Sequence, residues 1–217
     1  MKERIVKIKS RTNPNPNLSL RVIPGHFATT NSHLNFYIDM TFLKTRQSEA
    51  KEVAKAMVGE YVNNTVVDTI VCMDGCEVVA AYLAEELTAA GFMSRNAHKT
   101  IYIVTPEFNS NGQMIFRDNL QPEIREKNII LLAASVTTGL TVRKSLDCIR
   151  YYGGIIQGIS TIFSAVKVID GFPINTIFTT GDVPGYGSFK PHECPFCKNG
   201  DSVEALVNSY GYSALNK

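Results

Sequence analysis

The fold of this chain is decided by the stretch Leu131-Leu132-Ala133-Ala134-Ser135-Val136-Thr137-Thr138-Gly139-Leu140-Thr141-Val142-Arg143. The apolar run that begins at Asn128 and enters this stretch is typical of a strand buried on both faces of a sheet. Apolar residues at helical spacing then predict a helix from about Leu140 to Tyr152, which two glycines end. We therefore expect a strand, a tight turn and a helix in immediate succession.

The turn has the composition of an anion-binding cradle. The first-turn amides of a helix have no partner within the helix and point outward, and small residues let the backbone turn tightly before them. Hydroxyl groups add further donors. The predicted cradle comprises Ser135, Val136, Thr137, Thr138, Gly139, Leu140 and Thr141. The alternative is a plain turn in which a threonine caps the helix.

The rest of the body alternates between strand and helix. Strands are predicted at 66–72, 100–104, 155–163 and 175–179, helices at 48–57 and 77–90, and a hairpin or mobile loop where 109–112 joins 114–116. This order predicts an α/β fold with a central, mostly parallel sheet flanked by helices. Turns that follow parallel strands lie at the carboxyl edge of the sheet, where ligands usually bind.

The length of 217 residues is typical of one domain with appendages, so we expect a single domain over 1–217. Prolines and asparagines at 12–17 predict an extended connector, which makes 1–17 an arm and linker. Glycines and prolines become frequent after Gly181. We interpret 181–217 as an irregular C-terminal extension that carries a Cys-x-x-Cys pair.

Charge and composition exclude several classes of protein. The 22 basic and 20 acidic residues give a net charge of +2, far from the charge of a protein that neutralises many phosphates, so we expect no nucleic-acid partner. The charged N-terminus does not resemble a signal peptide, and no window approaches ~18 uninterrupted apolar residues, so we expect no membrane partner. Five cysteines, an odd number, indicate a reducing compartment and a cytoplasmic protein.

The central stretch resembles the signature of the type I phosphoribosyltransferases, in which two acidic residues and a hydrophobic pair precede Thr-Thr-Gly and a helix. Val136-Thr137-Thr138-Gly139 matches its loop. Other segments are similar to orotate phosphoribosyltransferases: Gly25-His26-Phe27 and Asn35-Phe36-Tyr37-Ile38-Asp39 to the N-terminal hood, Cys72-Met73-Asp74-Gly75 to the pyrophosphate loop, and the run 194–200 to a segment of some bacterial members. The resemblance covers roughly Pro24 to Gly200 in the right order.

This resemblance implies a type I phosphoribosyltransferase-like fold with an N-terminal hood, and an enzyme of nucleotide metabolism. Such an enzyme transfers ribose 5-phosphate from phosphoribosyl pyrophosphate (PRPP) to a nucleobase and releases pyrophosphate, with magnesium. The cradle would hold the 5′-phosphate, Asp74 and Gly75 would lie on the pyrophosphate side, and Phe36 and Tyr37 would lie near the base. Asp74 is the candidate catalytic residue, although an aspartate before a glycine also suits a plain turn. The resemblance further implies a homodimer.

The sequence departs from the family at four places. Ala133 and Ala134 stand where the family has the acidic pair that grips the ribose hydroxyls, and Leu140 replaces the second glycine of the loop. Thr105-Pro106 replaces an Arg-Lys pair, and Ala28 replaces a hood lysine. These losses support a rival hypothesis, a non-catalytic regulatory protein that senses a phosphoribosyl ligand or nucleotide. Arg95, His98, Lys99 and Arg117 are alternative basic residues for the pyrophosphate.

The C-terminal cluster around Cys194 and Cys197 has three interpretations. The Cys-x-x-Cys spacing lets two thiolates share a tetrahedral metal, and His192 lies close in sequence, so zinc at His192, Cys194 and Cys197 is one. Reduced cysteines in a proline-containing turn and a redox pair are the others. Zinc binding would favour a third function class, a structural or scaffold module.

Overall fold

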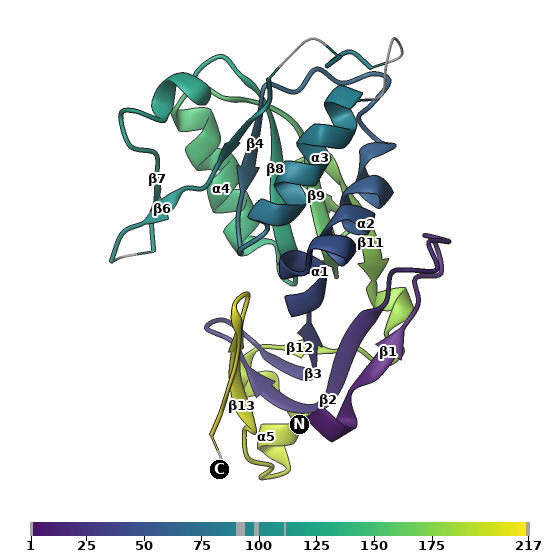
Figure 1. Ribbon diagram of the computed structural model, residues 1–217. Coiled ribbons are helices and arrows are strands. Elements are labelled where there is room, and N and C mark those ends of the chain that lie inside the picture. Colours follow the sequence, from purple (N-terminus) through teal and green to yellow (C-terminus); the bar gives the residue numbers. More distant parts are fainter. Residues whose placement is uncertain (1, 90–93, 98–99, 111, 216–217) are drawn as a thin grey trace.

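The computed structural model describes residues 2–89, 94–97, 100–110 and 112–215. Figure 1 shows a body of helices packed on a sheet, with a second sheet at one end of it that contains both ends of the chain. This second sheet is the predicted hood. The described residues of the body and the hood surround three clusters of buried apolar side chains. The first and second clusters lie on opposite faces of the central sheet, and the third lies in the hood.

The central sheet is parallel except at one edge. Its strands are β4 (Thr69–Cys72), β5 (Tyr102–Val104), β8 (Asn128–Val136), β9 (Ile155–Ser164), β10 (Val168–Ile169) and β11 (Phe172–Thr179). They lie in the order β10-β11-β9-β8-β4-β5, and only the β10–β11 pair is antiparallel. The prediction of a mostly parallel sheet is confirmed, and five of its six strands, all but β10, overlap ranges that the sequence predicts as strands.

Helices cover both faces of this sheet, as predicted. Helices α2 (Gln47–Val58) and α3 (Glu77–Ala89) supply side chains to the first apolar cluster, and α4 (Leu140–Tyr151) supplies them to the second (Figure 1). The two clusters share β8, whose alternate residues enter opposite ones: Leu132 lies in the first and Leu131 in the second. This two-sided burial explains why β8 reads as a continuous apolar run.

The hood is a mixed sheet built from both ends of the chain. Its strands are β1 (Val6–Ile8), β2 (Leu20–Ala28), β3 (His33–Asp39), β12 (Ser188–Phe189), β13 (Ala205–Asn208) and β14 (Gly211–Ala214). Their order is β12-β3-β2-β13-β14, and β1 pairs with β2 outside this path. The extension is irregular around α5 (Pro195–Lys198), but the β13–β14 hairpin was not predicted, because its strands are short and half exposed.

Short elements complete the described chain. They are α1 (Thr41–Thr45), the β6 (Glu107–Phe108) and β7 (Met114–Ile115) hairpin, and 3₁₀ turns at Lys2–Arg4, Gln121–Glu123, Thr180–Asp182 and Pro191–Glu193. The predicted hairpin is confirmed: β6 and β7 pair antiparallel and project from the body (Figure 1). None of the described helices is long and apolar enough to cross a membrane.

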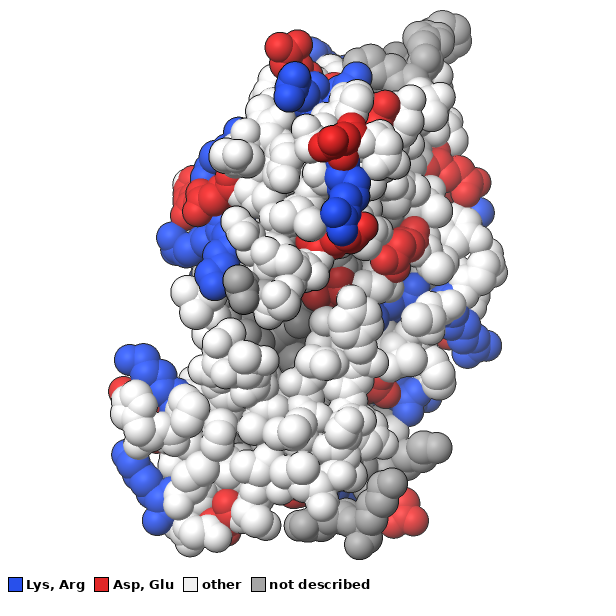
Figure 2. Space-filling model, turned by 90° about the vertical axis from the view of Figure 1, so that its left-hand side faces the viewer, with Lys and Arg blue, Asp and Glu red and all other residues white. Residues whose placement is uncertain are grey.

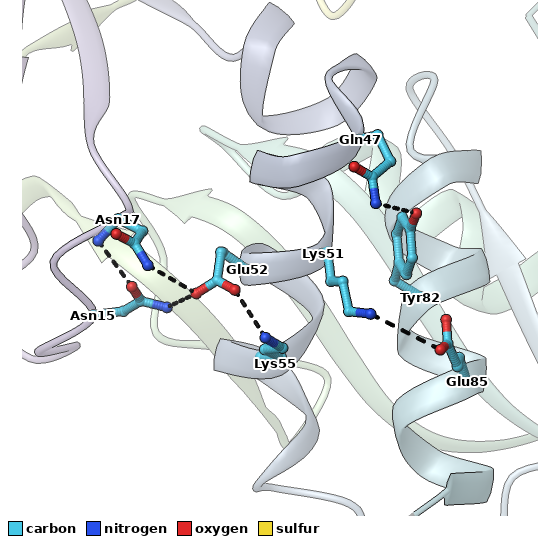
Figure 3. A network of polar contacts seen from close by, with 8 residues as sticks. All are labelled: Asn15, Asn17, Gln47, Lys51, Glu52, Lys55, Tyr82 and Glu85. Atoms are coloured by element: carbon cyan, nitrogen blue, oxygen red, sulfur yellow. Dashed lines mark hydrogen bonds and ion pairs between the residues drawn. The ribbon is translucent and has the colours of Figure 1, made fainter.

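The N-terminal linker is anchored to α2 by a carboxylate. The Glu52 carboxylate accepts hydrogen bonds from the side-chain amides of Asn15 and Asn17 at 2.9 and 3.4 Å, and it pairs with Lys55 (Figure 3). The amide of Asn15, followed by the ammonium of Lys55 and the amide of Asn17, lowers the pKa of Glu52 to about 2. The linker is free of helix, as its prolines predict, but it is not extended throughout, because the Leu18 N–H bonds the Asn15 carbonyl oxygen at 3.3 Å and closes a turn. It is docked on the body.

Candidate functional site

A cavity of about 210 Å³ lies where the carboxyl edge of the central sheet meets the hood. Its walls come from the turn after β8, the turn after β4, the β2–β3 hairpin and the end of β13. The lining residues are Thr29, Thr30, Asn31, Ser32, Leu34, Tyr37, Ile38, Met40, Asp74, Ser135, Thr137, Thr138, Thr141, Phe163, Tyr186, Val207, Asn208 and Ser209. The cavity thus lies where ligands bind in open parallel sheets.

The predicted cradle forms one wall of this cavity. Gly139 is the N-cap of α4, and its φ of 78° is the left-handed conformation that favours glycine. A Cβ atom at this position would lie 2.8 Å from Ile169 Cδ1, so the turn has no room for a side chain there. No side chain caps this helix start, which argues against the plain threonine-capped turn. The first-turn amides of α4 have no partner within the helix.

Four of the seven predicted cradle residues line the cavity, and all four carry hydroxyl side chains: Ser135, Thr137, Thr138 and Thr141. The side chain of Val136 is buried in the second apolar cluster, and Leu140 is half exposed. Together with Gly139 these two residues offer backbone groups only. The cradle therefore presents hydroxyls and amides, which are neutral donors suited to an anion.

Asp74 lines the cavity beside the cradle, in the turn after β4, the strand next to β8. Asp74 and Gly75 both have positive φ, 61° and 73°, which aspartate tolerates and glycine prefers. The Asp74 carboxylate accepts a hydrogen bond from the backbone N–H of Ala134 at 3.3 Å. Burial raises the pKa of Asp74, while hydrogen bonds from Ser209 and Ala134 oppose this shift. Gly75 does not line the cavity.

Lys44 does not line the cavity but supports the turn that contains Asp74, and the sequence analysis did not identify this lysine. Its side chain, in α1, is buried, and its ammonium donates to the backbone carbonyl oxygens of Asp74 at 2.5 Å and Ser209 at 2.6 Å. The lysine thus joins the turn after β4 to the turn after β13. Its position in a short helix after the hood, far in sequence from both partners, carries no signal that could have identified it.

The hood contributes aromatic side chains to the cavity. Tyr37 lines it, whereas its neighbour Phe36 packs against the first apolar cluster, because successive residues of β3 point to opposite faces. Tyr186, missed from the sequence, also lines the cavity. Its hydroxyl is buried and has no hydrogen-bond partner in the described part of the chain, and burial raises its pKa to about 12. An unpartnered buried donor is unusual, because buried polar groups are normally hydrogen-bonded.

The cavity has few charges. Among its described lining residues there is no lysine or arginine, and Asp74 is the one carboxylate. Arg143 pairs with Asp170 at 2.8 Å and Arg117 pairs with Glu107 at 2.7 Å, both on the surface. Arg95 is exposed. His98 and Lys99 lie outside the described residues. On the face drawn in Figure 2, basic and acidic side chains are interspersed.

Ala133 and Ala134, at the positions of the family's acidic pair, are fully buried on opposite faces of β8. Neither side chain can accept a hydrogen bond. The Asp74 carboxylate, bound to the Ala134 amide, is the nearest substitute among the described residues that line the cavity. Cys72 and Cys76 beside it are buried in the core, and burial raises the pKa of both thiols.

The C-terminal cysteine pair lies elsewhere, within the hood. Cys194 and Cys197 are close to His26 and His33, which come from β2 and β3. His192 is not part of this group: its side chain is exposed and lies 3.4 Å from the Glu193 carboxylate. The two histidines were not recognised as partners of the cysteines because they are more than 160 residues away in sequence.

Comparison with known proteins supports the family resemblance. The orotate phosphoribosyltransferase of Pelotomaculum thermopropionicum is 22% identical over 181 residues, which cover 82% of this chain and 86% of the relative. Among solved structures, the orotate phosphoribosyltransferase of Aeropyrum pernix superposes with a TM-score of 0.52 at 17% identity, over 74% of this chain and 88% of that one. The chain has the type I phosphoribosyltransferase fold.

Two further structures share this fold. The orotate phosphoribosyltransferase of Mycobacterium tuberculosis has a TM-score of 0.51 at 13% identity, covering 76% of this chain and 93% of that one. The adenine phosphoribosyltransferase of Thermoanaerobacter pseudethanolicus has a TM-score of 0.50 at 14% identity, covering 82% and 96%. No protein-family model matches the chain. Proteins of this fold thus act on different bases, and the fold does not identify the base.

Proposed function

We propose that this protein is a phosphoribosyltransferase that binds PRPP at residues 135–141 and transfers ribose 5-phosphate to a nucleobase. One observation carries the proposal: the uncapped start of α4, ringed by the hydroxyls of Ser135, Thr137, Thr138 and Thr141, opens into a cavity that the hood covers. The amides and hydroxyls of this cradle hold the 5′-phosphate. The fold and the orotate phosphoribosyltransferase relative support the same assignment.

Asp74 holds the pyrophosphate side of the ligand, next to the cradle. Its carboxylate lies against the Ala134 amide, so it can accept hydrogen bonds from the ribose hydroxyls where the acidic pair is missing. The residues also fit a magnesium ion that arrives with the pyrophosphate, because such ions are often bound by one carboxylate and the ligand's own phosphates. Bound there, magnesium would neutralise the leaving group.

The chemistry requires little from the protein beyond positioning. The bond from ribose C1 to the pyrophosphate oxygen breaks, a base nitrogen forms the new bond to C1, and the oxygen retains the bonding electrons. The transition state has oxocarbenium character, so donors that stabilise the leaving group matter more than a nucleophile. Asp74 is the candidate catalytic residue, with Gly75 shaping its turn. Tyr37 and Tyr186 border the space left for the base, and Phe36 supports Tyr37 from the other face.

We also infer from the family resemblance that the protein forms a homodimer and acts in the cytoplasm in nucleotide metabolism. The second candidate function is a regulatory protein that binds a phosphoribosyl ligand or nucleotide without turnover. The absence of lysine and arginine from the described cavity lining favours it, together with Ala133 and Ala134. Both functions use the same cradle and differ in whether pyrophosphate is released.

A pyrophosphate-release assay tests the proposal. The full chain is incubated with PRPP, magnesium and each of a panel of nucleobases that includes orotate and adenine. We expect release with at least one base, reduced at least tenfold in Thr138→Val, which removes one cradle hydroxyl, and unchanged in the control Thr88→Val at the far end of α3. Saturable PRPP binding without release for any base would contradict the transferase and support the regulatory function.

A further inference from the structure

Four metal-ligating side chains from three separate segments converge in the hood. His26 lies in β2, His33 begins β3, and Cys194 and Cys197 lie at the start and within α5. One ligand atom from each lies within 4.8 Å of the other three. In the part of the chain that the structure describes, no other group of histidine, cysteine and carboxylate side chains meets this condition.

The distances between these atoms match the edges of a small tetrahedron. His26 Nε2 lies 3.0 Å from His33 Nδ1, 3.5 Å from Cys194 Sγ and 3.7 Å from Cys197 Sγ, and His33 Nδ1 lies 3.3 Å from Cys197 Sγ. Bonds of about 2.0–2.1 Å from zinc to nitrogen and about 2.3 Å to sulfur require N···N edges of about 3.3 Å and N···S edges of about 3.6 Å. The four atoms are therefore spaced as ligands of one ion.

The surroundings of His26 prepare it for a metal. Its Nδ1 lies 3.1 Å from the backbone carbonyl oxygen of Asp201, which can only accept, so Nδ1 holds the proton and Nε2 presents its lone pair to the cluster. The ring of Phe196 stacks on the imidazole with centroids 5.2 Å apart. Both contacts come from the C-terminal extension and fix the orientation of the ring.

We propose that His26, His33, Cys194 and Cys197 bind one structural zinc ion. Two thiolates and two neutral imidazoles balance the charge of Zn²⁺, and the two thiol protons pass to solvent on binding. Sulfur donors select zinc over magnesium. Four protein ligands fill the tetrahedron and leave no position for water or substrate, so the site is structural.

The site fastens the C-terminal extension to the strand beside the cavity. Glu204 donates its backbone N–H to the His26 carbonyl oxygen at 2.8 Å, and β13 then pairs in parallel with β2. Asn208 and Ser209, at the end of β13, line the cavity. A zinc ion here would hold in place a wall of the candidate functional site without touching the ligand.

Zinc content of the full chain tests the proposal. Protein purified under reducing conditions and dialysed against a chelator is expected to retain close to one zinc ion per chain by elemental analysis. Cys197→Ser is expected to lose at least nine-tenths of it, whereas Cys148→Ser, which alters a thiol outside the cluster, and His192→Ala retain it. Cys197 is exposed, so its replacement leaves the buried Cys194 in place.

Cobalt provides an independent readout in the wild-type protein. Exchange of zinc for Co²⁺ is expected to give thiolate-to-cobalt charge-transfer bands and the visible bands of a tetrahedral ion, both absent from Cys197→Ser. If that variant does not fold, titration of wild-type thiols with a mercurial is expected to release zinc as two thiols react. A protein that carries no zinc and binds no cobalt, or one whose Cys194 and Cys197 form a disulfide under reducing conditions, would overturn the proposal.

Discussion

The cradle after β8 and the histidine–cysteine cluster of the hood differ in how the chain builds them. The cradle is local: seven consecutive residues, 135–141, supply its hydroxyls and its amides. The cluster is assembled from β2, β3 and α5, and its members are up to 171 residues apart. The sequence displays the first as a motif and shows only half of the second. A site made of consecutive residues can be recognised in the sequence alone, whereas a site assembled from distant segments depends on which strands become neighbours in the fold.

The largest expected effect concerns the local site. Replacing both Thr137 and Thr138 with valine removes two hydroxyls that line the cavity but leaves the backbone and volume nearly unchanged. Each hydrogen bond to a charged phosphate contributes about 1.5 kcal/mol or more, so affinity for ribose 5-phosphate should fall about a hundredfold. Calorimetry measures this, and an unchanged melting temperature serves as the control. Retained affinity would mean that the cradle does not bind the phosphate.

Asp74 tests whether the cradle acts together with the carboxylate beside it. Asp74→Asn keeps the positive φ and an acceptor for the Ala134 amide but removes the charge. We expect the magnesium-dependent part of PRPP affinity to fall about tenfold, as for one charge-assisted contact. Phosphate alone should bind as before. An equal loss for both ligands would contradict the assignment of Asp74 to the pyrophosphate side.

The same variant has a pH signature. Because burial raises the pKa of Asp74 in the folded protein, its carboxyl contributes stability that is complete below the unfolded pKa and is lost as the pH rises through the folded pKa. The asparagine variant lacks this loss. Its melting temperature should therefore exceed that of the wild type at neutral pH and approach it in acid. Thermal melts across this range measure the difference.

Lys44 tests how firmly the assembled wall depends on one side chain. Lys44→Met leaves the carbonyl oxygens of Asp74 and Ser209 without their buried donor. Unfolding free energy should fall by about 1–3 kcal/mol, which lowers the melting temperature by about 3–10 °C for a chain of this size. Lys51→Met, at the surface of α2, is the matched control and should change little. Equal stability of the two variants would contradict a stabilising role for the Lys44 hydrogen bonds.

Tyr186 gives the smallest expected effect and separates binding from stability. Its hydroxyl has no partner in the described part of the chain, so Tyr186→Phe should leave stability unchanged or slightly higher while ligand affinity falls about three- to tenfold. Tyr61→Phe is the matched variant with the opposite expectation. The Tyr61 hydroxyl forms a hydrogen bond of 2.8 Å with the Ser160 hydroxyl, and neither residue lines the cavity. This variant should lower stability by about 1 kcal/mol and spare affinity. Stability and affinity that change together in both variants would contradict this separation.

Much of the body could be predicted from the sequence because its strands, helices and turns are marked by patterns of neighbouring residues. The helical spacing predicts α4 to within one residue, whereas β8, buried on both faces, continues to Val136 and includes the first two predicted cradle residues. The turn at Asp74 was recognisable from its aspartate–glycine pair. In each case the residues that decide the structure are neighbours in the sequence.

The hood and the rear of the cavity could not be predicted in the same way. The β13–β14 hairpin has short strands with one exposed face, and it forms because β13 can pair with β2. Lys44 and Tyr186 reach the site only through tertiary packing. His26 and His33 meet the cysteines for the same reason. Such contacts follow from strand order, which no local pattern specifies.

Calorimetric titration of PRPP into the full chain, with and without magnesium, measures whether the cradle binds a phosphoribosyl ligand. It examines the cradle and Asp74 before any nucleobase is chosen. We expect saturable binding that tightens when magnesium is present and weakens in the double valine variant of Thr137 and Thr138. Absence of binding in both conditions, by a protein that melts cooperatively, would contradict this expectation.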